Sequence, residues 1–213
     1  MAPDMLVQLI TVLVPLVLSL TVHEYAHAAM AKALGDDTAE RQGRFTLDPM
    51  SHIDPIGSLA LPALLVLMNT GFWFGWAKPV PYDPLRFTSK IRMKNGVLLV
   101  AAAGPLSNLL LAVLSAALLS AFPDNDAARS FLSTCVLLNV LLFLFNLLPI
   151  PPLDGSKVAY GLLPDRWGGV LRFFQSKPYI APMAFMMIFL VGGRLIGPPM
   201  MAISEFLISL FGA

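Results

Sequence analysis

The sequence has 213 residues, of which 57% are hydrophobic and only 13% are charged, and its net charge at pH 7 is +1. Soluble proteins carry about one quarter charged residues, so this composition indicates an integral membrane protein. The sequence has no basic stripe or run large enough to follow a phosphate backbone, which excludes nucleic acid as a partner.

The apolar runs predict an all-helical membrane bundle. Three of them, at residues 5–31, 95–122 and 127–150, approach or exceed the roughly 20 residues that a spanning helix needs. They give expected helices over residues 5–34, 93–122 and 127–148, with one or two further helices over about 178–213. Because no linker divides the chain, residues 1–213 are expected to form a single membrane-embedded domain.

The segments between the long helices are less regular. Residues 38–48 have a pattern that suits short strands or a hairpin. Residues 57–70 are apolar but short and contain Pro62, so whether they span the membrane is left open. Residues 71–84 are rich in aromatics, Gly and Pro and cannot form a regular helix, so we expect an ordered loop or strand. The predicted fold is therefore all-α with a small β or re-entrant element.

The positions of Lys and Arg predict the orientation in the membrane. The loop before the second long helix is basic, and so is the segment after the third, expected as a loop or an amphipathic helix at 156–177. Their basic residues are Lys78, Arg86, Lys90, Arg92 and Lys94 in the first, and Lys157, Arg166, Arg172 and Lys177 in the second. We expect both on the cytoplasmic side of a multi-pass protein, most simply in the plasma membrane.

The first long helix carries the motif His23-Glu24-Tyr25-Ala26-His27, the His-Glu-x-x-His pattern of zinc metalloproteases. Residues four apart lie on one helical face, so both imidazoles can reach a single zinc ion. Glu24 lies beside that face, where it can act as general base toward a water molecule activated by the metal. A carboxylate within an apolar helix is costly, which favours this functional interpretation over two ordinary helix histidines.

A third protein ligand is needed, and the residues leave alternatives open. The candidates are His52, one of the aspartates, or a glutamate such as Glu205. Asp154 has the best location, because it follows the third long helix at the cytoplasmic end that also carries His23 and His27. The single cysteine, Cys135, lies in an apolar run and is expected to be a buried hydrophobic residue.

Three ordered motifs resemble those of the site-2 protease family. They are His23-Glu24-x-x-His27, Gly104-Pro105-x-x-Asn108, and Asn146-x-x-Pro149 leading into Leu153-Asp154-Gly155. The match spans roughly residues 20–160 and resembles the short form without a PDZ domain. The resemblance implies an intramembrane metalloendopeptidase with one zinc ion held by His23, His27 and Asp154, with Glu24 as catalytic base and Asn146 near the scissile carbonyl.

Two further sets of residues are predicted to contact the substrate, a membrane protein with a transmembrane segment. The amides of Asn146 and Asn108 are costly in apolar helices unless hydrogen-bonded, and either could donate to a developing oxyanion. An interhelical hydrogen bond is the alternative for each, and it is the preferred one for Asn108. A non-helical segment near the zinc could pair with an unwound substrate as an added strand. Its expected clamp residues are Phe74, Gly75, Trp76, Ala77 and Val80.

The rival functions are a zinc-binding membrane transporter and a non-proteolytic scaffold of the same fold. Transport favours ionisable residues spread along a path through the bilayer, but here they gather at one end. A scaffold has no need of Glu24. Outside the motifs, we expect His52 to hydrogen-bond to Asp54, and Glu205 to pack near an interface or pair with Arg194.

Overall fold

The computed structural model describes residues 3–68, 70, 75–164 and 180–212. Three of its helices are long and apolar enough to cross a membrane: α1 (Pro3–Ala33), α4 (Met93–Leu119) and α5 (Asp126–Asn146). They confirm the three long helices predicted from the apolar runs, with ends shifted by a few residues at most. The molecule is a helical bundle, as expected.

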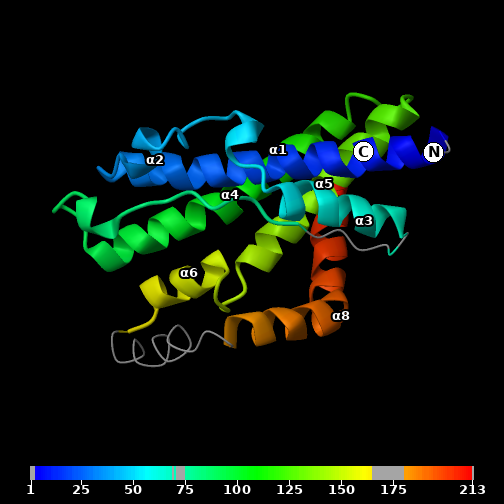
Figure 1. Ribbon diagram of the computed structural model, residues 1–213. Coiled ribbons are helices and arrows are strands. Elements are labelled where there is room, and N and C mark those ends of the chain that lie inside the picture. Colours follow the sequence, from blue (N-terminus) through cyan, green and yellow to red (C-terminus); the bar gives the residue numbers. More distant parts are fainter. Residues whose placement is uncertain (1–2, 69, 71–74, 165–179, 213) are drawn as a thin grey trace.

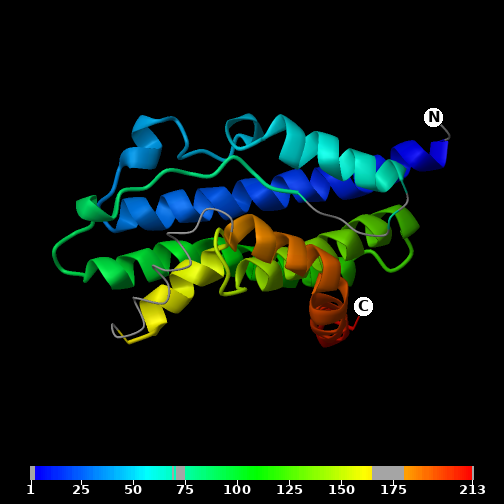
Figure 2. The same cartoon turned by 60° about the horizontal axis from the view of Figure 1, so that its bottom comes forward.

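Helix α4 lies at the centre of this bundle. It packs against α1, α5, α6 (Asp154–Leu162) and α8 (Ile180–Leu210), and Figures 1 and 2 both show α1 and α4 side by side. Small side chains make the close approach possible, since Ala112 and Ala116 of α4 are fully buried against α5 and α8. A second buried cluster joins α1 to α5 through Leu16, Leu20, Leu138 and Leu142.

Helix α8 accounts for the predicted C-terminal apolar segments. It contains Pro198 and Pro199 in its interior, and proline removes a backbone hydrogen bond and bends a helix. Figure 1 shows the two halves of α8 running in different directions. One bent helix therefore stands where one or two helices were expected.

The prediction of short strands at residues 38–48 is wrong. The segment contains a short helix, α2 (Thr38–Arg41), followed by turns, and the 3-10 helix η1 (Pro49–Ser51) begins directly after it. The buried carboxylate of Asp36 accepts hydrogen bonds from the backbone N–H and the hydroxyl of Thr38, which favours a helical start. Gly43, with φ +65°, then ends the turn in a conformation that suits glycine.

The apolar segment at 57–70 forms a π-helix, η2 (Pro55–Ala60), that continues into α3 (Leu61–Leu67). Asp54 begins η2, because its carboxylate accepts from the backbone N–H groups of Ile56 and Gly57. The combined helix is shorter than a membrane span. It lies beside α1.

Residues 75–83, called the extended segment below, are neither helix nor strand and lead into η3 (Pro84–Arg86). Trp76 donates its N–H to the carbonyl of Gly57 and accepts a hydrogen bond from the hydroxyl of Ser58. The N–H of Lys78 donates to the carbonyl of His52 at 2.8 Å. The described residues contain no strand, so the predicted β element is not found among them.

Helix α6 begins at Asp154, two residues before the predicted amphipathic segment, and ends at Leu162. The expected continuation toward residue 177 lies mostly outside the described residues. In Figure 1, α6 lies at the same end of the bundle as the C-terminal end of α1 and the N-terminal end of α4. This arrangement brings the predicted metal ligands of α1 and α6 together.

Candidate metal centre

His23 and His27 lie one turn apart on α1, and both are buried. Their Nε2 atoms are 3.1 Å apart, as the i, i+4 spacing allows. Gly104 of α4 leaves the room for these rings, because a Cβ at this position would lie 2.4 Å from Nε2 of His27 and 2.7 Å from Cε1 of His23. A larger residue at position 104, in the second sequence motif, would therefore collide with the two imidazoles.

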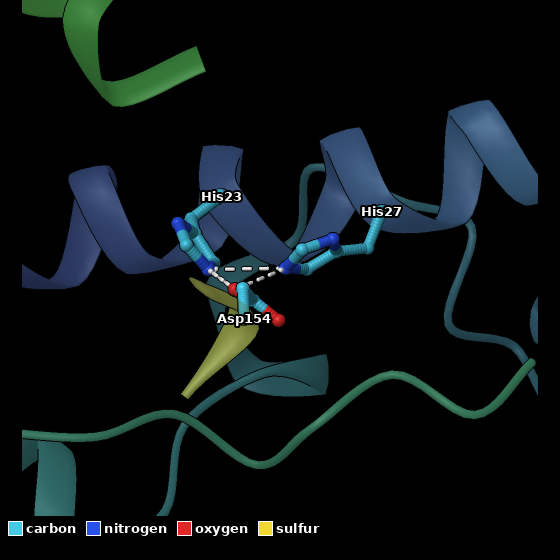
Figure 3. Close-up of side chains that lie close together, drawn as sticks. All are labelled: His23, His27 and Asp154. Carbon is cyan, nitrogen blue, oxygen red and sulfur yellow. Dashed lines mark hydrogen bonds and ion pairs between the residues drawn. The ribbon is translucent and has the colours of Figure 1, made fainter. Parts of the chain in front are cut away.

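Asp154 brings a carboxylate to the two imidazoles from the first turn of α6. Its Oδ2 lies 3.1 Å from each Nε2 atom (Figure 3). Gly155 lets α6 start against the end of α5, since a Cβ there would lie 2.3 Å from the backbone of Leu147 and Leu148.

The far side of each imidazole is held by a hydrogen bond. Nδ1 of His23 lies 2.6 Å from Oδ1 of Asn108, whose amide N–H groups donate to the Ser19 carbonyl and to Oδ1 of Asn139. Nδ1 of His27 lies 2.7 Å from the carbonyl of Val100. Both partners are acceptors, so both Nδ1 atoms carry the proton, and each Nε2 lone pair faces Asp154.

These residues fit a zinc ion. Three electron-rich atoms that lie within 4.8 Å of one another repel unless a cation or a proton lies between them. Ligands about 2.0–2.1 Å from a tetrahedral zinc lie about 3.3–3.4 Å apart, close to the separations seen here. Two imidazoles and one carboxylate, with a fourth position left over, form a ligand set that catalytic zinc sites use.

Glu24 lies beside the ligand group without belonging to it. It is buried, and its Oε2 accepts a hydrogen bond of 2.8 Å from the backbone N–H of Val80 in the extended segment. Glu24 therefore has one carboxylate oxygen fixed and the other available for a proton. The predicted general base thus lies beside the predicted metal ligands.

Two cavities meet at Glu24 and His23. The larger, of about 380 Å³, is mainly apolar and is enclosed by α1, α5 and the extended segment. The smaller, of about 160 Å³, is more polar and includes His27, Asp154, Tyr82 and Lys157. The ligand group thus has apolar surroundings on one side and polar surroundings on the other.

The two asparagines predicted to contact substrate lie in different places. Asn146 lines both cavities, and its amide donates to the carbonyl of Leu142. Asn108 is fully buried and lines neither cavity, because its amide links α1, α4 and α5 behind His23. The interhelical alternative therefore describes Asn108, which orients a predicted ligand and does not face a substrate.

The predicted clamp residues also lie in different places. Gly75, Trp76 and Ala77 line the apolar cavity, while Phe74 lies outside the described residues. Val80 does not offer its backbone donor to a substrate, because that N–H donates to Glu24. The predicted clamp residues that line only the apolar cavity therefore lie before Val80.

His52 and Glu205 lie outside the ligand group. The expected hydrogen bond between His52 and Asp54 is not formed, because His52 donates from Nε2 to the carbonyl of Thr46, and Asp54 caps η2. Glu205 is exposed on α8, and within the described residues no ion pair joins it to Arg194.

Two elements of the site were not identified from the sequence: the carbonyl of Val100 and the side chain of Asn139. A backbone carbonyl leaves no signal in a sequence. Asn139, by contrast, is a buried amide in an apolar helix, and the reasoning applied to Asn108 would have identified it.

The chain is similar to known proteins. A family model described as peptidase family M50 matches residues 120–191. The protein named "Putative zinc metalloprotease YwhC" from Bacillus subtilis is 37% identical, over 94% of this chain and 90% of its own. "Putative zinc metalloprotease Rip2" from Mycolicibacterium smegmatis is 36% identical over 68% of this chain and 53% of its own. No solved structure gives a comparable match. The chain therefore belongs to peptidase family M50, the site-2 protease family.

Proposed function

We propose that this chain is an intramembrane zinc metalloendopeptidase that hydrolyses peptide bonds in or near the transmembrane segments of other membrane proteins. The position of Glu24 carries the proposal, because this carboxylate borders both cavities beside the ligand group. Metal transport or storage would use the ligands but has no need of a carboxylate fixed next to them.

The chain's residues divide the chemistry between them. A zinc ion bound by His23, His27 and Asp154 supplies Lewis acidity, which polarises the scissile carbonyl and makes water a better nucleophile. Glu24 accepts the proton of the attacking water through the oxygen that Val80 does not hold. The water oxygen bonds to the carbonyl carbon, the C–N bond breaks, and Glu24 returns the proton to the leaving amine.

Asn146 is assigned to the developing oxyanion. It lines both cavities close to Glu24, and one of its amide N–H groups donates to the carbonyl of Leu142. The amide has a second N–H group, and a preorganised donor of this kind stabilises charge that develops in the transition state.

The apolar cavity indicates the substrate class. Leu16, Leu20, Leu142 and Phe145 line it, so it suits large apolar side chains. Bilayer helices satisfy their backbones internally, so a substrate must unwind locally before its peptide bonds are exposed. Within the described residues, the backbone N–H and carbonyl of Ala77 carry no hydrogen bond. We assign them to an unwound substrate that adds as a strand.

We propose the membrane orientation that the basic residues indicate. Lys32 lies in the last turn of α1, Lys94 in the first turn of α4 and Lys157 on α6. Figure 1 shows α6 at the same end of the bundle as these ends of α1 and α4. By the positive-inside rule this end faces the cytoplasm, so the site opens toward the cytoplasmic side of the plasma membrane.

The proposal is tested by reconstituting the purified protein in liposomes with single-span membrane proteins as substrates. Glu24→Gln should bind one zinc ion per chain and cleave at least about 100-fold more slowly, the lower end of a general base's contribution. Glu40→Gln is the matched control, because Glu40 is an exposed carboxylate that pairs with Lys32. Turnover by Glu24→Gln close to wild type would exclude the proposed mechanism.

A further inference from the structure

We propose that Arg44 is a positioning residue for Glu24 and acts through the peptide group that joins Pro79 to Val80. This inference rests on the proposed function, since it takes Glu24 as the general base. It extends the site to a residue that lies outside all three sequence motifs and lines neither cavity.

The surroundings of Arg44 are unusual for a cation. Its side chain is only 7% exposed, and within the described part of the chain it forms no ion pair with a carboxylate. Its Nε atom has no hydrogen-bond partner there either. Removing a guanidinium from water without an anionic partner is costly, so the few contacts that it does make have particular weight.

Those contacts are with the extended segment. Nη2 of Arg44 donates to the carbonyl of Lys78 and, at 3.4 Å, to the carbonyl of Pro79. The two carbonyls lie immediately before and after the proline, whose ring already fixes its φ angle. The guanidinium therefore restrains the one torsion of Pro79 that remains free, which sets the plane of the next peptide group.

That next peptide group reaches the general base. Its carbonyl belongs to Pro79 and its N–H to Val80, and in a planar trans peptide the two point in opposite directions. The N–H donates to Oε2 of Glu24 at 2.8 Å. One rigid group thus joins a buried cation to the carboxylate, and the positive charge at its oxygen strengthens the donor at its nitrogen.

The remaining anchors of the extended segment do not replace Arg44. Gly57 and Ser58 hold Trp76, the His52 carbonyl accepts from Lys78, and Asp36 accepts from the N–H of Asp83 at 2.6 Å. These contacts keep the segment docked at both ends. Loss of Arg44 should therefore release the Pro79–Val80 peptide locally, without undocking the segment.

The metal ligands are independent of this connection. His23 and His27 are held from behind by Asn108 and the Val100 carbonyl, and Asp154 is placed by α6. Removal of the guanidinium should therefore lower the efficiency of proton transfer while zinc binding is retained. A residue needed only for folding would not separate these two properties.

The first experiment measures amide hydrogen exchange by mass spectrometry on zinc-loaded protein, and it needs no substrate. Pro79 and Pro81 have no amide hydrogen, so a proteolytic peptide over 76–83, whose first two residues do not retain label, reports only on Lys78, Val80, Tyr82 and Asp83. Arg44→Met should accelerate exchange in this peptide at least about tenfold. Arg41→Met, which changes an exposed arginine of α2, should leave exchange unchanged. Equal exchange in Arg44→Met and wild type would overturn the proposal.

The second experiment compares kinetics in the liposome assay. Arg44→Met should lower kcat about 10- to 100-fold, within the contribution of a general base, with KM and zinc content unchanged. Arg44→Lys should have a higher kcat than Arg44→Met, because lysine keeps the positive charge but lacks the planar guanidinium group. An effect on KM alone, loss of zinc, or an unchanged kcat would contradict the assignment.

The two experiments also separate this inference from the proposed function. If wild-type protein cleaves no membrane substrate, the proposed function fails, while the exchange measurement still decides whether Arg44 holds the Val80 amide. If Arg44→Met does not fold, Arg44→Lys provides the same two readouts with smaller expected changes. Wild-type values for Arg44→Lys in both would overturn the proposal.

Discussion

The two sides of Glu24 are held by different kinds of structure. On the metal side, the ligands stand on regular helices, and each imidazole is bonded to α4 behind it. On the other side, the extended segment has no regular structure and is fixed by separate hydrogen bonds to η2, to Arg44 and to Glu24 itself. The proposed zinc binding and proton transfer therefore rest on different contacts, so single substitutions should affect one without the other.

The largest effect is expected on the metal side, from Gly104→Ala. The added methyl group would lie 2.4 Å from Nε2 of His27 and 2.7 Å from Cε1 of His23, so the imidazoles must leave the positions in which they face Asp154. We expect protein purified without bound zinc and without proteolytic activity, as measured by metal analysis and the liposome assay.

Gly197→Ala is the matched control for this change, because a Cβ at Gly197 meets no atom within 4 Å. It should bind zinc and cleave like the wild type. Full zinc occupancy in Gly104→Ala would show that the imidazoles do not need the positions seen here.

A smaller effect on the same side is expected from Asn108→Ala. The substitution removes the acceptor 2.6 Å from Nδ1 of His23 and leaves the ring free to turn or change tautomer. Loss of such an outer contact lowers metal affinity about 10- to 100-fold. Competition with a chelator of known affinity measures the change, and an unchanged affinity would mean that α1 alone orients His23.

The smallest effect is expected on the other side, from Ser58→Ala. This change removes the hydroxyl that donates to the Trp76 carbonyl at 2.8 Å, one of several contacts that hold the extended segment. A hydrogen bond of this kind contributes about 1 kcal/mol, so cleavage should fall several-fold. Zinc affinity measured in parallel should stay at the wild-type value, and a parallel fall in zinc affinity would contradict the division of the site.

This division also explains what could be predicted from the sequence. His23, Glu24 and His27 lie on one helix, so their relative positions follow from helical periodicity. Asp154 could be placed because the break after α5 returns the chain to the same end of the bundle. The three long helices follow from apolar length alone.

The extended segment could not be predicted in the same detail. Its position depends on contacts between residues far apart in the chain, such as Arg44 with Lys78 and Glu24 with Val80. This is why the sequence places Val80 among the clamp residues, although its N–H donates to Glu24. The prediction of strands at 38–48 is wrong for a related reason. The buried side chain of Asp36 favours a helix that the local sequence pattern does not show.

X-ray absorption spectroscopy at the zinc edge determines whether His23, His27 and Asp154 bind one zinc ion. Purified protein should contain one zinc ion with nitrogen and oxygen ligands at about 2.0–2.1 Å and no sulfur ligand. The spectrum should contain the multiple-scattering features of two imidazoles, and Asp154→Ala should lose the metal. Protein without zinc, or a ligand at about 2.3 Å that implicates the single cysteine, Cys135, would contradict the account.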